Sequence, residues 1–420
     1  MRTKDGPNKP PAKPVHVVRP STAVLTRGFD PGLSVGSARP AVFRSSTYVF
    51  SSPEAAERAF AIALGKAEAA PNESVDLIYA RLSHPNAEIF EDQIVPLEPG
   101  ALSAAVFNSG MAAISTLLLT HCHPGSSLIY TTPLYGGTHH LIRHVIAPLG
   151  VKLVPVPAGA TEALRSAIAD SRQPSLVFIE TPANPTLRMT DIAAAVAAAR
   201  QHANKPLVCV DNTLLGPGFQ HPLLLGADLS VYSATKYISG FSDLLAGVVL
   251  GRDRDRIVEL CAIRAILGNI LQPDECWLLT GRLPTVGLRM KRQSKNAMRI
   301  AEALATHPKV RKLHYPTHFD DAEQIRIRDA QCSYPGGLFS FELKGGKTAA
   351  FNFLRRLSIA HNAVSLGGVE SLACHPATTT HSEMTREELA ASGVTDSLVR
   401  VAVGIEDWRD LLHDFTQALG

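Results

Sequence analysis

The sequence has no long apolar run and no closely spaced cysteines, and each absence excludes a class of protein. No stretch approaches the roughly 18 consecutive apolar residues of a membrane-spanning helix, and the first twenty residues have no apolar signal-peptide core. The six cysteines are scattered singly, unlike those of a structural zinc site or a secreted disulfide framework. We therefore expect a soluble, cytoplasmic protein whose cysteines are packing residues.

The chain also has no large excess of charge of either sign. Its 41 Lys and Arg residues against 38 Asp and Glu residues give a net charge of +3, which is too balanced for a main partner that is a nucleic acid or an anionic membrane. We interpret the one basic segment, residues 289–295, as a solvated helix face. The histidines at 121, 123, 139 and 140 have no companion ligands in the sequence, so we expect no metal site.

The chain is long and rich in apolar residues, and their arrangement predicts an α/β fold. Its 420 residues, 45% of them hydrophobic, suffice for about two or three domains. Short apolar runs lie at 127–132, 152–157, 175–182, 206–213, 228–235 and 244–251, and helix-compatible segments lie at 110–121, 161–171 and 191–203. This alternation predicts a mostly parallel sheet with helices on both faces. A mostly helical stretch, 253–307, and an α+β region follow it, and the first nineteen residues are typical of a flexible arm.

Polar side chains follow three of the predicted strands. Asn184, Asp211 and the group Ser233, Thr235 and Lys236 each come directly after an apolar run, and ligands of open parallel sheets bind beyond the carboxyl ends of the strands. Desolvation lowers the pKa of a lysine, and the neutral amine can then form a Schiff base with an aldehyde. Pyridoxal 5'-phosphate (PLP) needs such a lysine, a carboxylate for its pyridinium nitrogen and donors for its phosphate. The sequence therefore predicts a PLP site.

Three further segments fit this prediction, each with a structural alternative. Gly110 and Met111 begin a predicted helix whose N–H groups suit a phosphate, although Ser109 before them is equally typical of a simple helix cap. Tyr135, on a glycine-rich turn, could stack on a flat ring or have only a structural role. Arg400 lies inside an apolar strand and needs an anion, which could be a substrate carboxylate or an internal acid.

The chain also resembles a known family in eight segments that follow one another in order. These are YAR (79–81), NSGM (108–111), LYGGT (134–138), ETPANP (180–185), VDNT (210–213), SATKY (233–237), VSLGGVESL (364–372) and RVAVGIED (400–407). They look like the signature segments of the Cys/Met-metabolism PLP-dependent enzymes. This family includes cystathionine γ-synthase, cystathionine γ- and β-lyases, methionine γ-lyase and O-acetylhomoserine sulfhydrylase.

The resemblance implies a fold class and an assembly. The fold is expected to be the PLP-dependent transferase fold type I, α/β in class, with a mostly parallel seven-stranded sheet in a large domain and a smaller C-terminal α+β domain. We divide the chain into an N-terminal arm and oligomer-contact segment (1–74), a large PLP-binding domain (75–275) and the C-terminal domain (276–420). The family's usual form implies a homotetramer with a dimer as the active unit, and a small amino acid as substrate.

The resemblance also assigns roles to individual residues. Lys236 matches the Schiff-base lysine and proton carrier, and Asp211 matches the partner of the ring nitrogen. Tyr135 matches the tyrosine that stacks on the ring and is a candidate acid for the leaving group. The phosphate site is matched by Gly110, Met111, Ser233 and Thr235, with Tyr79 and Arg81 reaching the phosphate of the neighbouring subunit. Asn184, Ser365 and Arg400 match the residues around the substrate carboxylate and the ring oxygen.

Two positions bear on the substrate. Val364 stands where the cystathionine γ-enzymes typically have a glutamate, and Gly137 stands where methionine γ-lyases typically have a cysteine, which together suggest an uncharged, roomier distal pocket. We expect a γ-lyase that acts on a methionine- or canavanine-type L-amino acid through ketimine and vinylglycine intermediates. The alternatives are a γ-replacement enzyme, such as O-acetylhomoserine sulfhydrylase or cystathionine γ-synthase, and a catalytically silent binding protein with a PLP fold.

Overall fold

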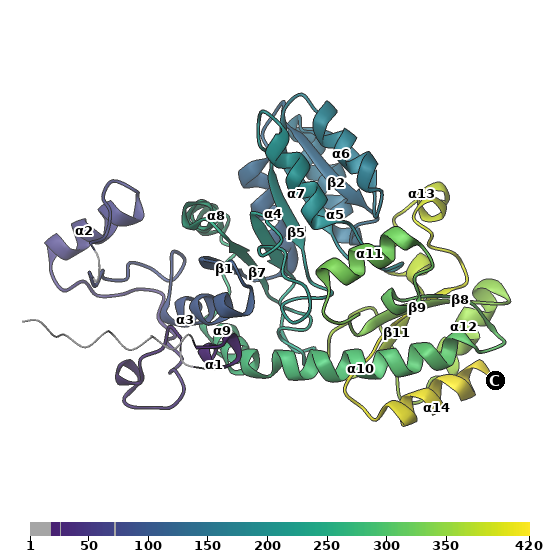
Figure 1. Ribbon diagram of the computed structural model, residues 1–420. Coiled ribbons are helices and arrows are strands. Elements are labelled where there is room, and N and C mark those ends of the chain that lie inside the picture. The colour runs from purple at the N-terminus through teal and green to yellow at the C-terminus, as the bar shows by residue number, and fades with distance from the viewer. Residues whose placement is uncertain (1–17, 26, 71–72) are drawn as a thin grey trace, which may run out of the picture.

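The computed structural model describes residues 18–25, 27–70 and 73–420 of the chain. Most of the predicted N-terminal arm lies outside these residues. The described N-terminal part holds α1 (Pro20–Ala23), η1 (Pro31–Ser34) and α2 (Pro53–Ala63). Ser52 caps α2 by accepting the N–H of Ala55 at 3.1 Å, and α2 stands away from the body of the molecule in Figure 1.

A seven-stranded sheet forms the centre of the larger half of the chain. Its order is β1 (Ser103–Phe107), β7 (Gly247–Gly251), β6 (Leu229–Tyr232), β5 (Leu207–Asp211), β4 (Pro174–Glu180), β2 (Ser127–Thr132) and β3 (Lys152–Pro157). β7 runs antiparallel to both of its neighbours and the other pairs are parallel. The predicted mostly parallel seven-stranded sheet is therefore confirmed.

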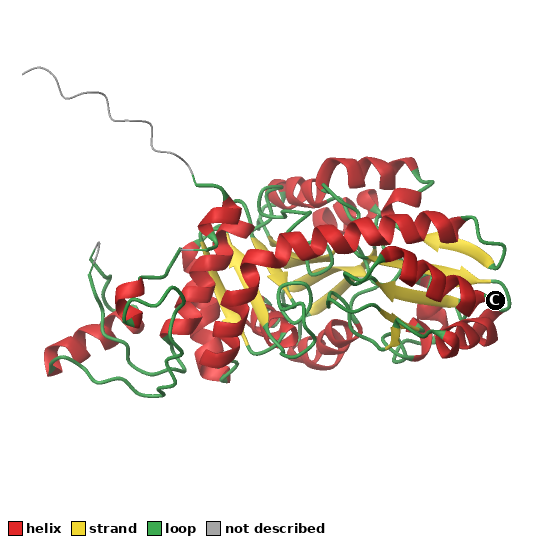
Figure 2. Ribbon diagram, turned by 90° about the horizontal axis from the view of Figure 1, so that it is seen from below, coloured by secondary structure: helices red, strands yellow, loops and turns green. Residues whose placement is uncertain are grey.

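Helices cover both faces of this sheet, as Figure 2 shows. One core contains Leu117 of α4 (Gly110–His121) and Leu260 of α8 (Arg254–Leu267), packed on alternate strand residues such as Phe178. The other contains side chains of α3 (Pro85–Ile94), α6 (Thr161–Asp170), α7 (Ile192–Gln201) and α9 (Pro273–Arg282). The strands are apolar on both sides because both sides are buried, which agrees with the continuous apolar runs in the sequence.

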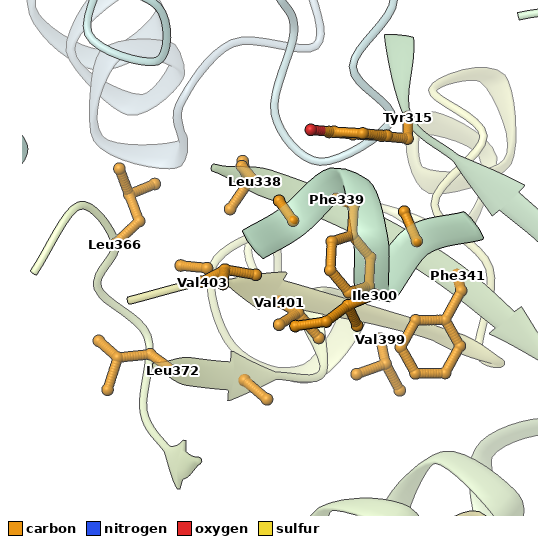
Figure 3. Packing of buried hydrophobic residues seen from close by; sticks show 14 of the residues in the cluster. Ile300, Tyr315, Leu338, Phe339, Phe341, Leu366, Leu372, Val399, Val401 and Val403 are labelled. Atoms are coloured by element: carbon orange, nitrogen blue, oxygen red, sulfur yellow. The ribbon is translucent and has the colours of Figure 1, made fainter. Parts of the chain in front are cut away.

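A second, five-stranded sheet forms the C-terminal region. Its order is β10 (His361–Asn362), β11 (Leu372–Cys374), β12 (Leu398–Ala402), β9 (Leu338–Leu343) and β8 (Val310–His314). Figure 3 shows Phe339 and Phe341 of β9 packed with Val399 and Val401 of β12 and with Ile300. The helices of this region are α11 (Ala322–Gln331), α12 (Gly346–Arg356), α13 (Arg386–Ala391) and α14 (Trp408–Leu419).

The long helix α10 (Val286–Ala305) corrects one prediction in part, because Lys291, Arg292 and Lys295 are exposed as expected and Arg289 is not. It runs from the region of α9 to the second sheet (Figure 1) and contains the basic segment that we interpreted as a solvated face. Arg289 is instead buried, and its guanidinium donates to the carbonyl oxygens of Tyr237 at 2.7 Å and Ile238 at 3.1 Å. The helical period turns every third or fourth residue of a charged run inward, so part of this run faces the core.

The predicted domain boundary between residues 275 and 276 falls inside α9, whose Cys276 and Leu279 pack in a core of the first sheet. The division at that position stays a prediction. None of the helices in the described part of the chain is both long enough and apolar enough to cross a bilayer.

Candidate active site

The residues that follow the central strands line one cavity of about 320 Å³. Its walls come from the first turn of α4, the ends of β4 and β5, the segment after β6, and β12 of the second sheet. The predicted residues that line it are Gly110, Met111, Tyr135, Asn184, Asp211, Ser233, Thr235, Lys236, Val364 and Arg400. Residues far apart in the sequence thus converge where parallel sheets bind ligands.

Lys236 lies in the turn after β6, with its side chain at the cavity. Its Nζ donates to Ser365 Oγ at 3.0 Å, which brings the predicted Ser365 into the site. Burial lowers the pKa of Lys236 to about 8, and the nearby positive charge of Arg400 adds to this effect. Gly367, at φ +80°, lies so close that a Cβ there would be 2.7 Å from the N atom of Tyr237. The loop that carries Ser365 is therefore packed directly against the lysine.

Asp211 ends β5 with one carboxylate oxygen engaged and one free. Oδ1 accepts the N–H of Thr213 at 3.0 Å and its hydroxyl at 2.6 Å, and the same hydroxyl accepts the N–H of Ser233 at 2.8 Å. Oδ2 has no hydrogen-bond partner among the residues that the structure describes. Burial raises the pKa of Asp211, so a cation bound at Oδ2 would stabilise its ionised form.

The first turn of α4 faces the end of β6 at very short range. A Cβ on Gly110 would lie 2.8 Å from both Cβ and Oγ of Ser233, so only glycine fits there. Ser109 caps the helix by accepting the N–H of Ala112 at 3.0 Å, and the N–H groups of Gly110 and Met111 have no intrahelical acceptor. Ser109 is thus a helix cap, and the free N–H groups that follow it are suited to an anion. The helix cap and the phosphate site, given above as alternatives, are compatible with each other. The Thr235 hydroxyl is bonded to the backbone of Ala246.

Arg400 is 2% exposed and has only neutral partners in the described part of the chain. Its guanidinium donates to Asn184 Oδ1 at 3.3 Å and to the carbonyl oxygens of Val364 and Ser365, the latter at 3.1 Å. No carboxylate of the described residues pairs with it, so the internal acid considered in the sequence analysis is not present there. A buried guanidinium without a counter-charge is suited to the carboxylate of a ligand.

Tyr135 and Val364 also border a second, wider cavity of about 900 Å³, which adjoins the first at Lys236. A Cβ on Gly137 would lie 2.8 Å from a ring carbon of Tyr135, so this glycine makes room for the tyrosine ring.

The expectation of an uncharged distal pocket is wrong for the outer part of this space. Arg143 pairs with Glu388 at 2.6 Å and His140 contacts Glu383 at 3.0 Å along the wall of the wider cavity. Arg143 lies in η3 (Ile142–Ile146), which follows α5 (Gly136–Leu141), and Glu388 lies in α13. The sequence could not show that these charged residues meet at the cavity, because the two segments are more than 200 residues apart.

Tyr79 and Arg81 lie apart from the cavity that contains Lys236. They line a different cavity with Arg44 and Asp274, and Arg81 donates to the carbonyl oxygen of Ala265 at 2.7 Å. Tyr79 is 42% exposed.

The structure adds two residues to which the sequence analysis gave no role. Glu180 ends β4 directly opposite Asp211 in the strand register, and Thr213 binds Asp211 as described above. The signal for Glu180 was present, because two neighbouring parallel strands both end in an acidic residue. The signal for Thr213 was a hydroxyl residue two positions after the aspartate, which is typical of a local side-chain turn.

The donor set of the cavity fits PLP. Asp211 Oδ2 is free for the pyridinium nitrogen, Lys236 is an amine of lowered pKa for the aldehyde, and the first turn of α4 with Ser233 is suited to the phosphate. The close contact at Gly110 leaves no room for a side chain that would cover these N–H groups.

Comparison with known proteins gives the same result. The model of the family described as "Cys/Met metabolism PLP-dependent enzyme" matches residues 21–420. The chain belongs to this family. L-methionine gamma-lyase of Pseudomonas putida is 39% identical over 401 residues, which are 95% of this chain and 96% of that protein. Cystathionine gamma-lyase of Mus musculus is 38% identical over 350 residues, 83% of this chain and 86% of that protein.

Solved structures agree with this assignment. Cystathionine gamma synthase from Xanthomonas oryzae pv. oryzae, in complex with cystathionine, is 33% identical with a TM-score of 0.86 and covers 96% of this chain and 98% of its own. The predictions of the family, of fold type I and of a PLP-dependent lyase are therefore confirmed. PLP is the cofactor of this member of the Cys/Met-metabolism family.

Proposed function

We propose that this PLP-dependent enzyme is a γ-lyase that removes the γ-substituent of a methionine- or canavanine-type L-amino acid. The observation that carries the proposal is the buried Arg400, which has no counter-charge in the described part of the chain and lies at the same cavity as Lys236. A guanidinium at this place is suited to the α-carboxylate of an amino acid and would hold its Cα close to the lysine amine. The relatives named methionine gamma-lyase support the reaction class.

In this proposal the residues around the cofactor divide its binding between them. Asp211 would pair with the ring nitrogen and Tyr135 would stack on the ring, while Asn184 would bind beside the ring oxygen and the substrate carboxylate. The phosphate would be held by Gly110, Met111 and Ser233, and Thr235 would join them by turning its hydroxyl away from the carbonyl oxygen of Ala246, to which it donates at 3.1 Å. When it is bound, PLP supplies an electron sink for charge that develops at Cα.

In this proposal Lys236 and Tyr135 carry out the proton transfers. Because the pKa of Lys236 is lowered to about 8, its amine can take a proton from carbon and return it near neutral pH. The Ser365 hydroxyl, at 3.0 Å, orients the amine. Tyr135 borders both cavities, so its hydroxyl is available to protonate a leaving group at the γ position.

The wall beyond Tyr135 bears on the choice of substrate. Val364 is 55% exposed and borders both cavities, and an apolar residue there does not select for the charged distal end of cystathionine. The cavity of about 900 Å³ next to it leaves space for a γ-substituent longer than a methylthio group, such as the guanidinooxy group of canavanine.

A second candidate is γ-replacement, because structures of cystathionine gamma synthases are 33% identical with TM-scores of 0.86. A substrate panel separates the two. Methionine, homocysteine, cystathionine, canavanine, O-acetylhomoserine and O-succinylhomoserine are each assayed for 2-oxo acid, homoserine and ammonia, with and without sulfide or cysteine. We expect these products to form from methionine or canavanine at a rate that does not depend on the added thiol. Product formation only with an added thiol, and only from an acylated homoserine, would establish the replacement enzyme instead.

We further propose that the active unit is a dimer, within a homotetramer. Tyr79 and Arg81 match residues that reach the phosphate of a neighbouring subunit, and their position at a separate cavity with part of the tyrosine exposed is compatible with that role. The protruding α2 (Figure 1) offers the apolar residue Phe60 for contact with another copy, and Leu64, directly after the helix, is exposed as well.

A further inference from the structure

Glu180 is a buried carboxylate at the active site that the functions proposed above do not use. It is the last residue of β4, only 5% exposed, and lines the same cavity as Lys236 and Asp211. In the register of the sheet its Cα is paired with that of Asp211 on β5. Two acidic side chains side by side in a buried place are costly, so the position needs a physical reason.

Both oxygens of Glu180 accept backbone N–H groups from segments that carry site residues. Oε2 accepts the N–H of Tyr135 at 2.7 Å, and Oε1 accepts the N–H of Asn184 at 3.2 Å. Tyr135 lies directly before α5, whereas Asn184 lies in the loop after β4. One carboxylate therefore joins these two loops.

The Asn184 end of this connection continues to the second sheet. Its side-chain oxygen accepts from Arg400 of β12 at 3.3 Å, and its carbonyl oxygen lies 3.1 Å from Nε2 of His381. A displacement of Asn184 would therefore also move the surroundings of the arginine that faces the substrate. Glu180 thus connects the part of the cavity that contains Tyr135 with the part that contains Asn184 and Arg400.

We propose that Glu180 is a positioning residue, which fixes the spacing between Tyr135 and Asn184 by holding both backbone N–H groups on one carboxylate. The inference rests on the proposed function in that it takes Tyr135 to lie on the cofactor ring and Asn184 to lie beside the substrate carboxylate.

The chemistry of the side chain explains why a carboxylate is used. A glutamine of the same size has one acceptor oxygen, and its NH₂ group can only donate. In Glu180→Gln the NH₂ group would face one of the two N–H groups, so that peptide would lose its partner and move away. Burial, with the charge of Asp211 as a smaller contribution, raises the pKa of Glu180, and the hydrogen bonds from the N–H groups of Tyr135 and Asn184 oppose this rise because they favour the ionised carboxylate.

Glu98 supplies a matched control. It is also buried, burial also raises its pKa, and it accepts from the Tyr232 hydroxyl and from the N–H of Leu223 at 3.3 Å. It does not line the cavity of Lys236. Glu98→Gln therefore reports the cost of removing a buried carboxylate from this domain without touching the site.

The experiment compares Glu180→Gln with Glu98→Gln and the unchanged enzyme. Apo-protein is titrated with PLP to give a dissociation constant, the visible circular dichroism of the bound cofactor is recorded, and KM and kcat are measured with whichever panel substrate reacts. We expect Glu180→Gln to weaken PLP binding roughly tenfold and to lower kcat/KM roughly 10–100-fold, with a raised KM, as the loss of a charge-assisted hydrogen bond predicts. The visible circular dichroism should change because the aromatic over the ring has moved.

Glu98→Gln should lower the thermal midpoint and leave the PLP dissociation constant and the dichroism unchanged. If Glu180→Gln lowers only the thermal midpoint, and keeps the wild-type PLP affinity, dichroism and KM, Glu180 is merely structural and the proposal is overturned. Should Glu180→Gln not fold, Glu180→Asp carries the same test, because its shorter side chain cannot reach both N–H groups. The PLP dissociation constant and the visible circular dichroism need no turnover, so both can be measured even if the enzyme catalyses another reaction. The substrate panel tests the proposed reaction separately.

Discussion

At the start of α4, Gly110 lies against Ser233 without space for even a methyl group. A Cβ would be 2.8 Å from two atoms of the serine side chain and 3.0 Å from its Cα, so Gly110→Ala must push the helix away from the end of β6. We expect the PLP dissociation constant to rise roughly tenfold to a hundredfold, because such overpacking costs about 1–3 kcal/mol. Titration of the apo-protein with PLP measures this.

Gly287, in α10, is the matched control. It is exposed and a Cβ there meets nothing within 4 Å, so Gly287→Ala should keep the PLP affinity and stabilise the helix by up to about 1 kcal/mol. Equal PLP affinities for the two variants would show that the α4 terminus does not bind the phosphate.

Single residues differed in how far the sequence could predict them. Lys236 and Asp211 were predicted because a lysine and an aspartate directly after apolar strands are unusual for solvated side chains. Glu180 has the same placement, but its role depends on which N–H groups fold back onto it, and those belong to Tyr135, 45 positions earlier, and Asn184. The sequence could not supply that contact.

Among the elements, α10 has a role that its composition conceals. Arg289 is the buried basic residue of that segment, and it donates to the carbonyl oxygens of the two residues that follow Lys236. Arg289→Ala would leave both buried carbonyls without a donor, so we expect the free energy of unfolding to fall by about 2–6 kcal/mol, at about 1–3 kcal/mol for each of the two groups. PLP affinity should fall as well, because the turn of Lys236 loses its support. Denaturant unfolding and PLP titration test both effects.

Arg292, three residues further along the same helix, is exposed and makes one long contact of 3.4 Å with the carbonyl oxygen of Glu406. Arg292→Ala should change the free energy of unfolding by no more than about 0.5 kcal/mol. If the two variants lose the same stability, the buried contacts of Arg289 do not support the lysine turn.

The elements that the sequence predicted well are those with strong apolar periodicity. β2, β3 and β4, and helices α4, α6 and α7, lie within a residue or two of the predicted ranges. β1 and β11 were not predicted, because short runs such as SAAVF and LAC are rich in small residues without β-branching and are held in place by their neighbours in the sheet. The charged wall of the outer cavity was missed for a related reason: the Arg143–Glu388 ion pair and the His140–Glu383 contact are both tertiary contacts.

At the scale of the whole molecule, the position of Tyr79 and Arg81 decides how many chains make one site. They line a cavity other than that of Lys236, so within one chain these two residues and Lys236 do not share a pocket. The proposed dimer would place this pair of one chain over the phosphate of the other. Under that arrangement every site needs Lys236 from one subunit and Arg81 from its partner.

Hybrid dimers test this requirement directly. Lys236→Ala and Arg81→Ala should each be nearly inactive alone, the first because it lacks the amine and the second because the phosphate loses a cation. When the two are denatured together and refolded in equal amounts, half of the dimers are hybrids, and each hybrid has one site with an intact lysine and an intact arginine from opposite chains. We therefore expect about a quarter of the wild-type activity to return, as closed twofold symmetry requires. If Arg81 instead serves the site of its own chain, each site in a hybrid lacks either Lys236 or Arg81. The mixture then stays as inactive as its components, which would contradict the proposed dimer.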